Sequence, residues 1–156
     1  MTFYQDLTPY VYFKRREPPD LLSLNIGWLD VTQPYVQGDT SQVFRDRLFE
    51  FCLDKYVVHI ARGFQECQFC GLSSEPWFEE NEFKYGENAH WMSIGDGEIR
   101  VLGSSAIYSA PALIYHYVVE HHYKPPQEFI EAVLTGPTPG SDAHMALLKQ
   151  LGLGRY

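Results

Sequence analysis

The sequence predicts a single α+β domain, with a mainly antiparallel sheet and three to four helices packed on one face. The chain has 156 residues, of which 45% are apolar, and this is the size and composition of one globular domain with its own core. Strand patterns lie before and after a helical pattern in the first third of the chain, and further helical patterns follow near its end. Runs of strands mixed with later helices favour the α+β class.

Short apolar runs define the expected strands, which cover residues 22–28, 56–60, 90–94, 98–102 and 106–108. The first alternates apolar and polar residues and so predicts one buried face, whereas the second is rich in β-branched residues. The third and fourth flank Gly95-Asp96-Gly97, a turn whose glycines permit positive φ, and therefore predict a hairpin. Arg100 is expected on the surface of this sheet.

Apolar residues at helical spacing predict helices over 41–54, 111–121, 126–134 and 142–151. Asp39 or Thr40 caps the first helix, and Asp39 followed by Gln42 fits a capping box. Pro111 suits a first helical position, and Gly136 follows the third helix as a terminating glycine. Cys52 lies among the apolar residues of the first helix, so we expect it in the core.

The whole chain, residues 1–156, is expected to form one domain. Residues 1–20 are rich in aromatic residues and predict an irregular N-terminal arm or an edge strand, while residues 137–156 predict a C-terminal helical tail. The longest helix-compatible apolar stretch, residues 110–119, is about half of the roughly 20 residues that span a bilayer. The N-terminus lacks the order of a secretory signal. We therefore expect a soluble, cytoplasmic protein with no membrane partner.

The charge balance is acidic, with 12 Lys and Arg against 20 Asp and Glu, which gives a net charge of −8. This balance disfavours nucleic acid as a partner, because binding to phosphates needs a basic face. Acidic and aromatic residues crowd one segment and form a candidate interaction surface: Glu75, Trp77, Phe78, Glu79, Glu80 and Glu82. The segment is either a solvated loop or a docking surface for a basic protein partner.

Two cysteines and two histidines have the spacing of metal ligands. Cys67 and Cys70 form a C-x₂-C knuckle, and His116 and His121 form an H-x₄-H pair. These are the spacings of a Cys₂His₂ zinc site, although the two halves lie farther apart than the roughly 12–15 residues of a zinc finger. The four residues are therefore candidate ligands for a metal, with zinc as the candidate cofactor. Other possible ligands are His59, His90 and His122.

Helix geometry restricts this interpretation. On a straight helix, five residues turn through about 500°, which leaves the two imidazole rings about 140° apart. Both histidines can ligate one ion only if the helix ends before His121, and Lys124-Pro125 favours an early end. Two alternatives stay open for the cysteines: reduced loop residues, and a redox pair. A redox pair usually opens a helix, for which the residues after Cys70 are poor material.

The sequence carries no complete enzyme signature, and whether the protein is an enzyme stays undecided. It has no GxSxG, HExxH or Walker motif. Arg62 stands at the end of an apolar run and is a candidate ligand for an anion. The alternative for Arg62 is a structural pairing with a carboxylate or with backbone carbonyls.

Several motifs together resemble a family of small bacterial proteins of unknown function. They lie at residues 25–30, 62–70, 97–101 and 110–118, and at His121, Tyr123, Pro125, Pro126 and Phe129. The resemblance implies a bacterial cytoplasmic setting and groups Arg62, Cys67, Cys70, His116 and His121 as one possible site. In the family pattern R-G-F-H-x-C-x-x-C a histidine precedes the first cysteine by two residues. Here that position is Gln65, so a site using that histidine is altered.

These observations lead to two main functional hypotheses. The first is a non-enzymatic binding or interaction module, of the immunity or antitoxin kind, which rests on the acidic aromatic segment and the missing catalytic set. The second is a metal-dependent enzyme or metal-binding protein that uses Cys67, Cys70 and His116. A thiol redox protein that uses the two cysteines of the knuckle is a third hypothesis.

Overall fold

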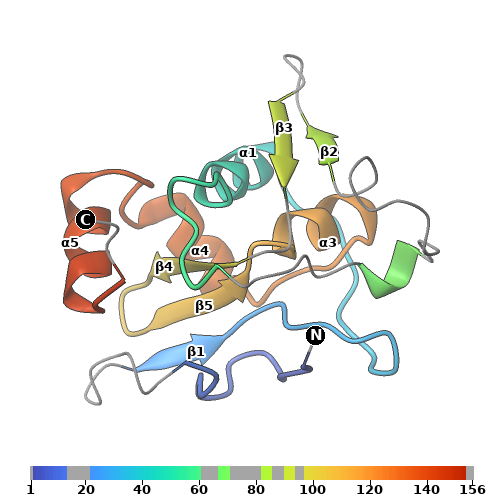
Figure 1. Ribbon diagram of the computed structural model, residues 1–156. Helices are drawn as coiled ribbons and strands as arrows, with labels where there is room; N and C mark the ends of the chain where they lie inside the picture. Colours follow the sequence, from blue (N-terminus) through green and yellow to red (C-terminus); the bar gives the residue numbers. More distant parts are fainter. Residues whose placement is uncertain are drawn as a thin grey trace.

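The structure is a computed structural model that describes residues 2–13, 22–60, 67–70, 82–85, 90–93 and 97–153, with the backbone alone for 82–85 and 90–93. It confirms the α+β class (Figure 1). In chain order the elements are β1 (Ser23–Asn25), α1 (Gln42–Phe51), the 3₁₀ turn η2 (Gln68–Cys70), β2 (Glu82–Tyr85), β3 (His90–Ser93), β4 (Glu98–Leu102), β5 (Ile107–Pro111), α3 (Ile114–Glu120), α4 (Gln127–Thr135) and α5 (Asp142–Gln150).

The main sheet has the order β1-β5-β4 and is mixed. β4 and β5 pair antiparallel, whereas β1 pairs with β5 in parallel, so the expectation of a mainly antiparallel sheet needs this correction. β2 and β3 form a separate antiparallel pair. The predicted hairpin between 90–94 and 98–102 is therefore wrong, because each of these strands pairs with a different partner. Residues 56–60 contribute only one bridge, from Val58 to Glu98.

Gly97 explains why the predicted hairpin turn misled. A Cβ at this position would lie 2.3 Å from Val57 Cγ1 and 2.8 Å from the carbonyl oxygen of Val58. Gly97 has no positive φ. Glycine is thus required at position 97 because residues 57–58 approach the start of β4 closely. A positive φ is not what requires it.

One face of the sheet is apolar and carries α1, α3 and α4. Ile99 and Val101 of β4 share a buried core with helix residues such as Phe44 and Phe129. The rings of these two phenylalanines meet edge to face with 6.4 Å between their centroids. In Figure 1, α1 and α3 lie above the sheet, and the N-terminal segment runs below it beside β1. This arrangement agrees with the predicted packing of helices on one face of the sheet.

The first helix ends at Phe51 and not at residue 54, and the predicted cap of this helix and start of the next one are also wrong. Ser41 is the N-cap of α1, and its side chain accepts a hydrogen bond from the Phe44 amide at 3.2 Å, so the capping box at Asp39 does not form. Pro111 ends β5 and does not open a helix. Gly136 follows α4 as predicted, and Cys52 is buried at 1% exposure. No helix within the described ranges is sufficiently long and apolar to cross a membrane.

The last helix, α5, lies beside the turn that joins β4 to β5 (Figure 1). Its N-cap is Ser141, whose hydroxyl accepts from the His144 amide. Leu147 and Leu151 pack with Ile107 of β5 in a second apolar cluster. The helix predicted over 142–151 is therefore present as α5, and it covers one end of the sheet.

The other face of the sheet is polar but buried. Arg100, Ser109 and Asn25 lie in one row across the three strands, and each is fully buried. The expectation that Arg100 lies on the sheet surface is wrong. Its guanidinium forms an ion pair with Glu98 at 2.8 Å, and its Cζ lies 4.7 Å from the centre of the Tyr10 ring. A buried charge needs such partners, because desolvation is otherwise too costly.

Tyr10 completes this arrangement from the N-terminal arm. Its hydroxyl donates to Glu98 Oε2 at 2.8 Å, and the residue is fully buried. Burial raises the pKa of Tyr10 far above its usual value, so the phenol stays a neutral donor. The described part of the arm, residues 2–13, contains isolated bridges but no helix or named strand, and Tyr10 ties it into the core.

We predict that Glu98→Gln lowers the free energy of unfolding by about 3 kcal/mol, because it leaves the buried Arg100 charge without its carboxylate. Urea denaturation at pH 7 measures this change. Glu131→Gln is the matched control, since Glu131 is exposed on α4 and should change stability by less than about 0.5 kcal/mol. Equal stability of the two variants would contradict the prediction.

Candidate metal centre

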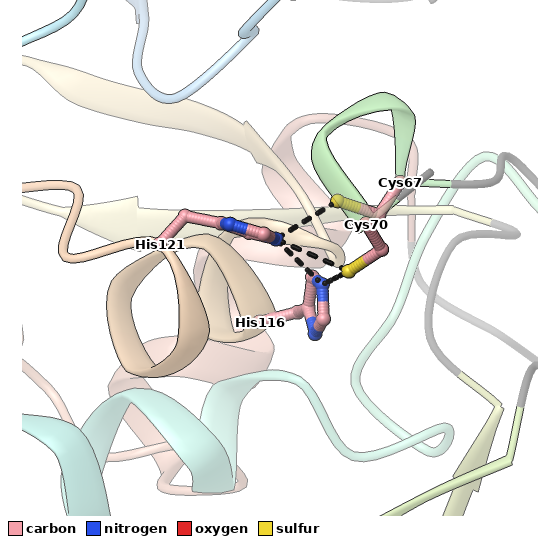
Figure 2. Close-up of side chains that lie close together, drawn as sticks. All are labelled: Cys67, Cys70, His116 and His121. Atoms are coloured by element: carbon pink, nitrogen blue, oxygen red, sulfur yellow. Dashed lines mark hydrogen bonds between the residues drawn. The ribbon is translucent and has the colours of Figure 1, made fainter. Parts of the chain in front are cut away.

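Two short segments supply four potential metal ligands. Cys67 immediately precedes η2 and Cys70 ends it, whereas His116 lies in the first turn of α3 and His121 caps the C-terminal end of that helix. The ligand atoms of all four residues lie within 4.8 Å of one another, and Figure 2 shows the side chains converging. The structure therefore brings together the four candidate ligands that the sequence predicts.

The distances are close to those of a tetrahedral metal shell. Cys70 Sγ lies 3.1 Å from His116 Nε2 and 3.2 Å from His121 Nε2. His121 Nε2 is also 3.2 Å from Cys67 Sγ and 3.2 Å from His116 Nε2. Zn–N bonds of about 2.0 Å and Zn–S bonds of about 2.3 Å separate tetrahedral ligand atoms by roughly 3.3–3.8 Å. The four distances lie just below this range and the other two pairs lie within 4.8 Å, so movements of up to about 1 Å would admit a zinc ion.

The convergence of the two histidines depends on where α3 ends. The helix ends at Glu120, and His121 follows as the C-cap with φ −113° and ψ 9°. His122 then adopts a left-handed φ of 52°, which turns the chain away from the helix axis. The condition set by the sequence, an end before His121, is met. Both Nε2 atoms can therefore face the same point although five positions separate the residues.

Packing holds the cysteine knuckle against α3. The Phe69 ring meets Tyr35, Tyr117 and His121, with centroid distances of 5.3, 5.7 and 5.4 Å. The Val31 amide donates to Gln68 Oε1 at 3.1 Å. These contacts do not involve the sulfur atoms, so they position the thiols before any ion binds.

The ring of His121 is held from its backbone side as well. The Tyr35 hydroxyl donates to the carbonyl oxygen of His121 at 3.0 Å. The sequence alone did not indicate that Tyr35, Phe69 and Gln68 are parts of the site. The only available signal was that Phe69 and Gln68 stand between the two cysteines; nothing local linked Tyr35 to them.

Burial sets the protonation of the histidines. Burial, together with the neighbouring His121, lowers the pKa of His116 to about 4. Burial also lowers the pKa of His121. Both imidazoles are therefore neutral at neutral pH, and a neutral ring offers the lone pair that a metal requires.

The cysteines differ in their surroundings. Cys67 is buried at 3% exposure, whereas Cys70 is exposed. Partial burial, and then the adjacent Cys67, raise the pKa of Cys70 to about 11. Without a cation the Cys70 thiol keeps its proton at neutral pH, and metal binding would have to release it.

The remaining predicted site residues stand apart from this cluster or outside the described residues. His59 stacks on Phe13 with 4.5 Å between the ring centroids, and His122 is exposed next to the cluster. Glu82 and His90 begin β2 and β3, whose side chains are not described. The residues that lie outside the described ranges are Arg62, Glu75, Trp77, Phe78, Glu79 and Glu80.

The fold and the cluster define an α+β domain that carries a Cys₂His₂ site between a loop and the end of a helix. The chain belongs to the family described as a domain of unknown function (DUF7919), whose profile matches residues 2–134. The match contains all four cluster residues and ends before α5. Neither the curated proteins nor the solved structures contain a match to this chain. The resemblance to a family of unknown function is thus confirmed.

In the metal-free protein, we predict that stability falls as the pH drops from about 6.5 toward 4. The folded pKa of His116, about 4, lies below the unfolded value near 6.5, so the unfolded state binds more protons in this window. Denaturation with chelator at pH 7 and pH 5 tests this, and His116→Gln should lose less stability than the natural chain. His122→Asn, at an exposed position, should behave as the natural chain does. An equal loss in all three proteins would contradict the prediction.

Proposed function

We propose that this protein binds one Zn²⁺ through Cys67, Cys70, His116 and His121, in a structural centre. The observation that carries the proposal is the convergence of four ligand atoms within 4.8 Å of one another. Thiolate and imidazole together are the donor set that zinc prefers in tetrahedral protein sites.

The number of protein ligands favours a structural role over a catalytic one. Catalytic zinc usually has three protein ligands and keeps one position for water or substrate. Four side chains converge here, two from the knuckle, one from α3 and one from its C-cap, and together they would complete a tetrahedral shell. A metal-dependent enzyme using Cys67, Cys70 and His116 is therefore the less favoured form of the proposal, because His121 would occupy the open position.

A zinc ion would join segments that are distant in the sequence. Between the knuckle and the histidine pair, the two ligands nearest in the sequence are Cys70 and His116, which are 46 positions apart. A cross-link that closes a long loop restricts the unfolded chain more than one that closes a short loop. The centre would thus stabilise the docking of the knuckle on α3.

The first functional hypothesis, an interaction module, is compatible with a structural zinc. The acidic aromatic residues, of which Glu75 is the first, follow Cys70 closely in the sequence. We propose that the zinc centre fixes the point from which this segment starts, and that a basic protein is its partner. Recovery of such a partner with the zinc-loaded chain, and its loss after Glu79→Lys with Glu80→Lys, tests this part.

We predict that the purified chain contains one zinc ion per molecule, measured by elemental analysis, and that His121→Asn binds less than a tenth of that amount. His122→Asn is the matched control. It changes the next residue, which is exposed and has a left-handed backbone that asparagine tolerates, so it should keep its zinc. Equal zinc contents in the two variants, or a natural chain that takes up no zinc, would contradict the proposal.

Removal of zinc should lower the melting temperature. A ligand at about 1,000 times its Kd contributes about 4 kcal/mol, which corresponds to about 10 °C for a chain of this size. Calorimetry with and without a chelator measures the shift. His121→Asn should melt at the same temperature in both conditions, and a natural chain that is equally insensitive would contradict a structural role.

A further inference from the structure

The four ligands of the proposed zinc centre differ in their access to solvent. Cys67 and His116 are buried, with exposures of 3% and 1%. His121 is half-buried, and Cys70 is exposed. A reagent in solution therefore meets the centre first at Cys70.

Zinc would keep the Cys70 sulfur reactive. A thiol that ligates a metal is held as the thiolate, and the thiolate is the nucleophilic form. Reactivity toward oxidants follows thiolate character and exposure. Among the cysteines, Cys70 alone combines the two, because Cys67 is shielded within the cluster and Cys52 is buried away from it.

Cys67 is placed to react with an oxidised Cys70. Both sulfur atoms belong to the cluster in which no two ligand atoms are more than 4.8 Å apart. A disulfide needs about 2.05 Å between the sulfurs, so a displacement of at most a few ångströms forms the bond. The backbone between the two cysteines is the short turn η2, in which the Cys70 amide meets the Cys67 carbonyl at 3.4 Å. A turn closed by such a long hydrogen bond offers little resistance to that displacement.

We propose that Cys70 is a peroxide-sensitive modification site, and that its oxidation to a disulfide with Cys67 releases the zinc ion; this inference rests on the proposed function. The Cys70 thiolate attacks a hydroperoxide, the O–O bond breaks, and an alcohol, or water from hydrogen peroxide, leaves with a proton. Cys70 is then a sulfenic acid. The Cys67 thiolate attacks the sulfur of this sulfenic acid and the S–S bond forms. The hydroxide that leaves takes up a second proton and becomes water.

The reaction transfers two electrons from the two sulfurs to the peroxide and removes two of the four ligands. His116 and His121 alone are an incomplete shell for a structural zinc. Loss of the ion removes the cross-link between the knuckle and α3, and contacts such as the packing of Phe69 then hold the knuckle without it. The strength of this tether would thus depend on the presence of peroxide.

Hydrogen peroxide added to the zinc-loaded full chain tests the proposal. A chromogenic chelator should detect one zinc ion released per chain, and peptide mapping should find a disulfide between Cys67 and Cys70. A thiol reductant with added zinc should restore the loaded protein. Zinc retained at full disulfide formation, or zinc released with both thiols still reduced, would overturn the proposal.

Variants identify the sulfur that reacts first. Cys52→Ala should behave as the natural chain, whereas Cys70→Ser, loaded with zinc, should release the ion at least about tenfold more slowly. If Cys70→Ser does not hold zinc, limiting iodoacetamide on the zinc-loaded natural chain decides the order, and Cys70 should be alkylated first. Faster alkylation of Cys67 or Cys52 would count against the assignment.

The two proposals fail in different ways. A chain that cannot be loaded with zinc under reducing conditions contradicts the proposed function itself. A chain that binds one zinc ion and keeps both the ion and its reduced thiols under excess peroxide contradicts only the modification site.

Discussion

The end of α3 at Glu120 is the constraint on which the candidate metal centre depends. One further helical residue would place the His121 ring about 140° around the helix from His116. The chain instead leaves the helix through His122, whose backbone is left-handed. Two backbone hydrogen bonds to residues 36–38 then hold this segment. The Gly38 amide donates to the His122 carbonyl and the Lys124 amide donates to the Val36 carbonyl, both at 2.9 Å. The loop after β1 thereby fixes the angle between the two histidines.

The position of α3 is in turn fixed by the main sheet. The chain passes from β5 into α3 with only two residues between them, and the first five residues of the helix are buried. Gly27 lets the chain after β1 approach the helix, because a Cβ there would lie 2.9 Å from Ile114 Cδ1. Its amide donates to Asp6 Oδ1 at 2.8 Å, while Asp6 Oδ2 accepts from the Tyr123 hydroxyl at 2.7 Å. The N-terminal arm, the sheet and the helix end therefore form one support for the centre.

The sequence was sufficient for the features that depend on local spacing. Apolar periodicity located the helices, and the C-x₂-C and H-x₄-H spacings located the four candidate ligands together with the condition for their convergence. The sequence was insufficient for features that depend on contacts between residues far apart in the chain. The glycines beside β4 indicated a turn, but Gly97 is required by its close approach to Val57, which is forty positions away in the sequence. Arg100 could not be recognised as buried, because its partner Tyr10 comes from the other end of the domain. Tyr35 was missed for the same reason.

Charge explains how a centre with buried ligands can exist with and without its ion. Two thiolates, two neutral imidazoles and one Zn²⁺ sum to zero. Replacing the ion by two protons keeps the sum at zero, and so does a disulfide between the two sulfurs. None of the three forms buries a net charge beside Cys67 and His116, so none has the large desolvation cost of an isolated ion. They differ in cross-links: the proposed ion would join the knuckle to α3, whereas the proposed disulfide would join the knuckle only to itself. A change of state at this centre would therefore act on how two segments are tethered and leave the charge of the core unchanged.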